Sequence, residues 1–111
     1  MIAVIFEVTP KEGATDRYFE IAGDLKQVLS EMDGFISIER FQSVTTPSRY
    51  LSLSFWQDEK SVKLWRNQFA HRQAQNEGRN NLFKDYRLRV ANVLRDYGLD
   101  DRQQSPVDIE Q

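Results

Sequence analysis

Residues 49–75, RYLSLSFWQDEKSVKLWRNQFAHRQAQ, decide the fold, because the period of hydrophobicity changes within them. Along residues 49–57 apolar and polar side chains alternate, which is typical of a strand. The two faces of this strand differ: Leu51, Leu53 and Phe55 on one, Tyr50, Ser52, Ser54 and Trp56 on the other. Asp58 then suits a helix N-cap, and Glu59 places a negative charge in the first turn. A helix is therefore predicted from this point to about Gly78.

The amino-terminal half contains a second predicted helix with one apolar stripe. Thr15 or Asp16 can cap its start, and Gly34 suits a left-handed position at its end. The stripe consists of Tyr18, Ile21, Ala22, Leu25, Val28, Leu29 and Met32. Recurrence at steps of three and four residues predicts an amphipathic helix.

Three further strands are predicted, over residues 2–8, 35–42 and 84–97. The resulting order, strand-helix-strand-strand-helix-strand, is the ferredoxin-like α+β plan. It predicts a four-stranded antiparallel sheet with both helices on one face. The domain is expected to cover residues 1–97, and the polar residues 98–111 are expected to form a weakly ordered tail.

Composition excludes several kinds of site. The chain has 111 residues, the size of one domain, and a net charge of −2 with dispersed basic residues, so no nucleic-acid surface is predicted. It has no cysteine, which excludes disulfides and thiolate chemistry, and its single histidine, His71, argues against a zinc or copper site. The amino-terminal MIAVIFEV lacks the pattern of a signal peptide and is too short to span a membrane. A cytoplasmic protein is expected.

The distribution of apolar residues over the sheet predicts a homodimer. Two helices cover only one face of the sheet, yet residues 2–8 are apolar on both faces and residues 49–57 carry large side chains on both. An uncovered face of this kind would be an exposed apolar patch that promotes association with other protein molecules. We therefore expect two copies to pack sheet to sheet around a two-fold axis, with the long last strand reaching towards the partner.

The segment WQDEKSVKLWRNQFAHRQAQ, followed by YRLRVANVLRDYG, resembles the antibiotic biosynthesis monooxygenase family of dimeric α+β barrels. The resemblance runs from MIAVIFEV to Tyr97, with GFISIERFQS and LSLSFW similar to the family's middle strands. It implies a pocket between the sheet and the helices of each subunit. Members include cofactor-independent oxygenases of aromatic polyketides, haem-degrading enzymes and isomerases.

The resemblance also implies roles for individual residues. Trp65 falls where the oxygenase members place a pocket tryptophan, and His71 lies about where some of them place a tyrosine. Ser61 stands where those enzymes carry an asparagine. Gln75 takes the position of the haem-ligating histidine, so haem degradation is not expected. An asparagine that both groups carry early in the chain has no counterpart here, because Glu7 is the only polar residue of the first strand.

Each candidate has an alternative, purely structural role. Trp65 shares a helical stripe with Val62 and Phe69, so it belongs either to the core or to a pocket wall where a flat substrate stacks. His71 is either a general base, because its pKa lies near neutrality, or a surface residue. On a continuous helix it would lie about 240° around from Trp65. Glu7 is either half of an ion pair or a cavity carboxylate whose pKa is raised by burial.

Taken with the resemblance, these residues favour a cofactor-independent, monooxygenase-type oxidoreductase that oxidises a small, flat aromatic or quinol-like molecule with O2. No metal or cofactor, nucleic acid or membrane is expected as a partner. The alternatives are a non-catalytic small-molecule-binding barrel and a proton-transfer isomerase. The expected catalytic residues are Trp65, His71 and Glu7, and the expected substrate-binding residues are Trp56, Ser61, Phe69, Phe83 and Tyr86.

Overall fold

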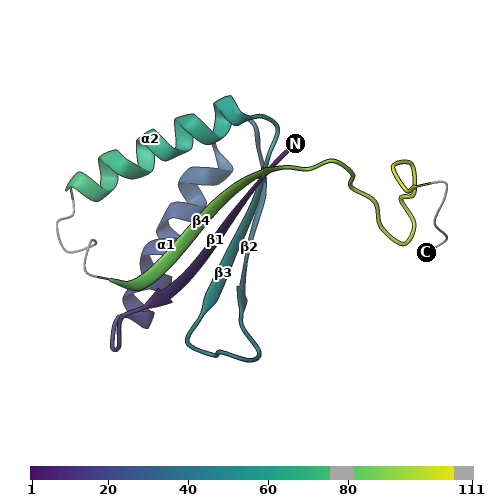
Figure 1. The fold of residues 1–111 in the computed structure, drawn as a ribbon. Helices are drawn as coiled ribbons and strands as arrows, with labels where there is room; N and C mark the ends of the chain where they lie inside the picture. Colours follow the sequence, from purple (N-terminus) through teal and green to yellow (C-terminus); the bar gives the residue numbers. More distant parts are fainter. Residues whose placement is uncertain (76–81, 107–111) are drawn as a thin grey trace.

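A computed structural model describes residues 1–75 and 82–106, with the side chains of residues 68–75 outside the description. Within these residues the chain forms β1 (Ile2–Pro10), α1 (Thr15–Ser30), β2 (Phe35–Gln42), β3 (Tyr50–Trp56), α2 (Glu59–Gln75) and β4 (Phe83–Asn92). The strands form one antiparallel sheet in the order β2-β3-β1-β4. Both helices lie on the same face of this sheet (Figure 1). The predicted ferredoxin-like α+β fold is therefore confirmed.

Two predicted boundaries are wrong. The N-cap of α1 is Ala14 rather than Thr15 or Asp16, and within the described residues it makes no side-chain cap hydrogen bond. β4 ends at Asn92 and not at residue 97. The reason is the register: Asn92 pairs with Ile2, the first residue of β1, and beyond this pair Met1 O accepts one more backbone hydrogen bond, from Val93 N–H at 3.0 Å, at the start of the described chain.

The cross-strand register sorts the strand residues into two faces. On the face that the helices cover, one row across the sheet consists of Arg40, Ser52, Phe6 and Leu88, and the next of Ile38, Ser54, Val4 and Val90. The opposite face carries Ile5, Leu51, Leu53 and Phe55, and no helix of the described chain lies over it (Figure 1). The covered face of β3 is therefore the one with the serines, Tyr50 and Trp56.

The core lies where α2 and the end of α1 meet β3. Its buried residues are Val4, Leu29, Trp56 and Val62, with Met32, Phe35 and Trp65 among those packed against them. Trp56 is fully buried, and its indole N–H donates to Ser54 Oγ over 3.0 Å. This bond satisfies the polar atom of a side chain that would otherwise be costly to bury.

A compact junction joins the α1–β2 turn to the start of α2. Asp58 Oδ1 accepts hydrogen bonds from the Ser61 backbone N–H (2.9 Å) and hydroxyl (2.8 Å), which confirms Asp58 as the N-cap of α2. These bonds hold the pKa of Asp58 below its ordinary value. Gly34, with φ +82°, accepts a backbone hydrogen bond from Gln57 at 2.8 Å, and a Cβ added to it would overlap Ser61 Oγ.

The segment after β4 runs away from the sheet (Figure 1). Local hydrogen bonds shape it, including Gly98 N–H to Asp101 O at 2.8 Å and Asp96 N–H to Gln104 Oε1 at 2.7 Å. Leu94 and Leu99 are exposed on this segment. In the described part of the chain, no helix combines the length and apolar character needed to cross a membrane.

Candidate functional site

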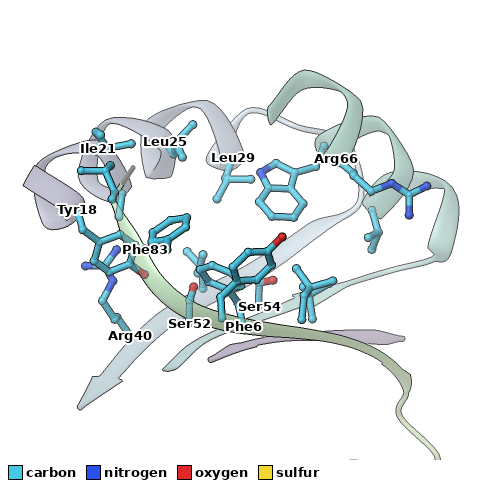
Figure 2. A pocket seen from close by; sticks show the side chains of 18 of the residues that line it. Phe6, Tyr18, Ile21, Leu25, Leu29, Arg40, Ser52, Ser54, Arg66 and Phe83 are labelled. Atoms are coloured by element: carbon cyan, nitrogen blue, oxygen red, sulfur yellow. The ribbon is translucent and has the colours of Figure 1, made fainter. Parts of the chain in front are cut away.

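A cavity of about 720 Å³ lies between the covered face of the sheet and the two helices (Figure 2). The sheet contributes Val4, Phe6, Ile38, Arg40, Ser52, Ser54, Leu88 and Val90, and the helices contribute Tyr18, Ile21, Leu25, Leu29, Val62 and Trp65. The size suits one small organic molecule.

Two serines make room for this cavity. Ser52 and Ser54 alternate along β3 on the covered face, between the bulky Tyr50 and Trp56. Trp56 is packed in the core, and the Tyr50 ring meets Phe19 of α1 edge-on at 4.9 Å. Large side chains therefore hold the helices away from the sheet at both ends of β3. The small serines between them leave the space below the helices unfilled.

One wall of the cavity is aromatic. Phe6, Tyr18, Phe83 and Tyr86 form a connected cluster with ring centroids 5.7–5.9 Å apart in tilted and edge-to-face arrangements. These geometries are the favourable ones for aromatic pairs. Tyr86, at 60% exposure, and Leu88, at 44%, lie on β4, so this side of the cavity faces solvent. A flat ring entering past β4 would meet aromatic surfaces.

Trp65 lies at the boundary between the core and the cavity. Its ring centroid is 5.8 Å from that of Trp56, and it packs against the buried core. The same side chain lines the cavity. The two roles considered for this residue are therefore compatible: one side of the indole belongs to the core, while the cavity reaches another.

Polar groups line the cavity at several places, and Lys84 and Asp85 of β4 are among them. Tyr18 and Arg40 lie together at one end and Arg66 lies at the other, with Ser52 and Ser54 between them (Figure 2). Burial raises the pKa of the Tyr18 phenol, and the neighbouring Arg40 guanidinium offsets part of this rise. Tyr18 is therefore a neutral phenol at physiological pH, able to donate a hydrogen bond.

Other expected site residues lie in different places. Phe83 and Tyr86, which are predicted to bind substrate, are among the residues that line the cavity. Trp56 is buried in the core, and Ser61 is bonded to Asp58 at the start of α2; neither is among the cavity-lining residues.

The three remaining candidates divide into two groups. Glu7 lies on the face of the sheet away from the cavity, where its Oε1 accepts a hydrogen bond from Arg89 Nη1 at 2.8 Å. The side chains of Phe69 and His71 lie outside the described residues. The structure therefore brings together Trp65, Phe83 and Tyr86, and it places Glu7 elsewhere.

Tyr18, Arg40 and Ser52 line the cavity but were not expected there. Tyr18 was visible as the first member of the apolar stripe of α1, and Arg40 as a charge within a strand. Their meeting depends on the β2–β3 register, which sets Arg40 beside Ser52, and on the docking of α1 over both strands. In the sequence, only the alternation of small and large residues in YLSLSFW indicates a cavity, because small side chains on one face of a strand leave space beside it.

Comparison with known proteins assigns a family. The family model described as antibiotic biosynthesis monooxygenase matches residues 1–77. The chain belongs to this family. A protein of Pyricularia oryzae named Jasmonate monooxygenase ABM is 46% identical over 93 residues, which cover 84% of this chain and 43% of that protein. YqjZ of Bacillus subtilis is 29% identical over 93 residues, covering 84% of this chain and 79% of that protein.

This chain therefore spans less than half the length of the Pyricularia relative. The names of the family and of that relative support a monooxygenase-type function.

Solved structures agree on the fold. A Deinococcus radiodurans structure that carries the antibiotic biosynthesis monooxygenase name has a TM-score of 0.75 at 10% identity, covering 89% of this chain and 98% of that one. Rv0793 of Mycobacterium tuberculosis has a TM-score of 0.73 at 15% identity, covering 87% and 98%. At these identities the likeness concerns the fold alone.

Proposed function

We propose that this protein is a cofactor-independent oxidoreductase that oxidises a small, flat aromatic or quinol-like molecule with O2 in the cavity between sheet and helices. The observation that carries the proposal is the aromatic-walled cavity of about 720 Å³, which Trp65 lines. The Pyricularia relative is named for a small organic molecule, jasmonate, which supports a substrate of similar scale.

The residues of the cavity suit such a reaction. An activated methylene group of an aromatic substrate would become a carbonyl as one oxygen atom of O2 enters the product and the other leaves as water. The substrate supplies all four electrons, so the protein needs only to position the ring, take a proton and stabilise the anion that remains. Trp65 would stack against the ring. His71 is the proposed base.

Oxygen consumption in air with anthrone as substrate tests this proposal. We expect uptake of one O2 per anthrone oxidised, and a loss of at least about tenfold in rate for Trp65→Phe, equivalent to about 1.4 kcal/mol of transition-state stabilisation. Tyr97→Phe, which removes a hydroxyl on the segment beyond β4, is the control and should retain the wild-type rate. Tight anthrone binding without oxygen uptake would instead favour a non-catalytic binding module.

We further propose that the protein acts as a homodimer whose subunits pack through their open sheet faces. Ile5, Leu51, Leu53 and Phe55 lie on that face, and Phe41 at its edge strand is 43% exposed. Leu94 and Leu99 are 81% and 90% exposed on the segment that leaves the sheet, where a partner subunit could cover them. Contiguous apolar surface of this kind supports an interface.

A further inference from the structure

Arg40 occupies an unusual position in the cavity. It projects from the edge strand β2 on the covered face, and its guanidinium carbon lies 5.5 Å from the Tyr18 ring centroid and 5.3 Å from that of Phe19. Both aromatic residues belong to α1. A guanidinium held over two rings is already partly ordered, so a ligand that binds to it has less side-chain freedom to remove.

This guanidinium has no anionic partner among the residues whose side chains the structure describes. The ion pairs found there join Arg17 to Glu20 and Arg89 to Glu7. Asp85 also lines the cavity, but it lies on β4, and β3 and β1 separate that strand from β2. Arg40 is itself exposed, and a guanidinium at one end of a largely apolar cavity is suited to an anionic ligand group.

Two hydroxyl groups lie beside Arg40. Ser52 is its direct cross-strand neighbour on the same face, and Tyr18 is 5% exposed, with a phenol that stays neutral at physiological pH. Each can donate a hydrogen bond to an oxygen that Arg40 binds. The row then continues across the sheet to Phe6 and Leu88, a span of about 14 Å at the usual strand spacing. The β2 and β3 positions of this row therefore carry a cation and a hydroxyl group, and the β1 and β4 positions are apolar.

We propose that Arg40, assisted by Tyr18 and Ser52, binds the carboxylate of the substrate while its apolar ring system lies along Phe6 towards β4. The substrate class is then a small, flat carboxylic acid. This inference rests on the proposed function of the cavity as a small-molecule site. A carboxylate fits better than a larger polyanion, because a single planar guanidinium matches its one charge and two oxygens.

Calorimetric titration with 2-naphthoate and with 2-naphthamide, its neutral counterpart, tests the assignment. We expect the wild-type protein to bind the carboxylate at least about tenfold more tightly than the amide. Arg40→Gln should remove this preference by weakening carboxylate binding about tenfold while amide binding persists, which also shows that the cavity is intact. Arg40→Lys should give an intermediate preference, because it keeps the charge but not the planar fork.

Arg66→Gln is the matched control, because Arg66 lines the opposite end of the same cavity (Figure 2). It should leave the preference for the carboxylate unchanged. If the preference survives Arg40→Gln, or is lost in Arg66→Gln instead, the assignment to Arg40 is overturned while the cavity remains a binding site. If neither compound binds to any form of the protein, the small-molecule function fails, and the carboxylate site fails with it.

Discussion

Gly34 and Gly13 have the same backbone conformation but different surroundings. Both have φ +82°, a left-handed value that favours glycine. A Cβ at Gly13 would have no heavy atom within 4 Å, whereas a Cβ at Gly34 would overlap Ser61 Oγ. Ser61 in turn bonds to the N-cap Asp58. Gly34 is therefore required both by its backbone angle and by the close approach of α2.

Replacing each glycine with alanine separates these two causes. Gly13→Ala should lower the free energy of unfolding by about 1–2 kcal/mol, the cost of a left-handed alanine. Gly34→Ala should lower it by about 2–4 kcal/mol, because displacement of Ser61 adds to that cost. Urea denaturation measures both values. Equal losses for the two variants would show that the contact with Ser61 relaxes without cost.

At this scale, the sequence allowed some residue roles to be predicted and not others. Phe83 and Tyr86 were expected in the cavity and line it. Trp56 was expected there too, but it lies in the core, because local pattern does not reveal which aromatic residue the helices will cover. Arg40 and Tyr18 meet only after two distant elements dock, so no local pattern could place them at one site.

Helix α2 begins where a short network of hydrogen bonds satisfies its amino-terminal N–H groups. Asp58 accepts from the backbone and the hydroxyl of Ser61, and these two bonds are the main reason that its pKa is lowered. A carboxyl with a lowered pKa in the folded state stabilises the fold above its unfolded pKa. This stabilisation is lost as the pH falls through the folded pKa.

Substitution at Asp58 should therefore change stability in a pH-dependent way. Asp58→Ala should lower the melting temperature at pH 7 by a few degrees, and the difference from wild type should shrink as the pH falls through the pKa of Asp58 in the folded protein. Asp58→Asn, the control, retains a capping oxygen without the titration, so its loss at pH 7 should be smaller. A difference between wild type and Asp58→Ala that stays constant with pH would contradict the role of the charge.

The elements themselves were largely predictable, because each has a clear period. The alternation in β3 and the stripe of α1 identified both elements and their faces. Which face of β3 the helices cover was not predictable, since Tyr50 and Trp56 on one face are as bulky as Leu51 and Phe55 on the other. The end of β4 was overestimated because it depends on where β1 begins, a non-local property.

For the whole molecule, the main prediction concerns the open face of the sheet. Sedimentation at micromolar concentration should give twice the mass of one chain. Leu53→Glu, which places a charge on that face, should shift the protein towards the monomer because an unpaired charge would be buried in the interface. Lys63→Glu, at an exposed position on α2, is the control and should leave the mass unchanged. A monomeric wild-type protein would refute the proposed interface.

The two edge strands of this sheet, β2 and β4, have a consequence for solubility. β2 and β4 each have one row of backbone N–H and C=O groups that pairs with no neighbouring strand in the described chain. Such edge strands can pair with strands of other molecules. Both carry charges along their length, with Glu39 and Arg40 on β2 and Lys84, Asp85, Arg87 and Arg89 on β4. Charge at these positions discourages fibre-like stacking. Arg40 would thus have two roles: it would contact the ligand, and its charge on an edge strand would oppose aggregation.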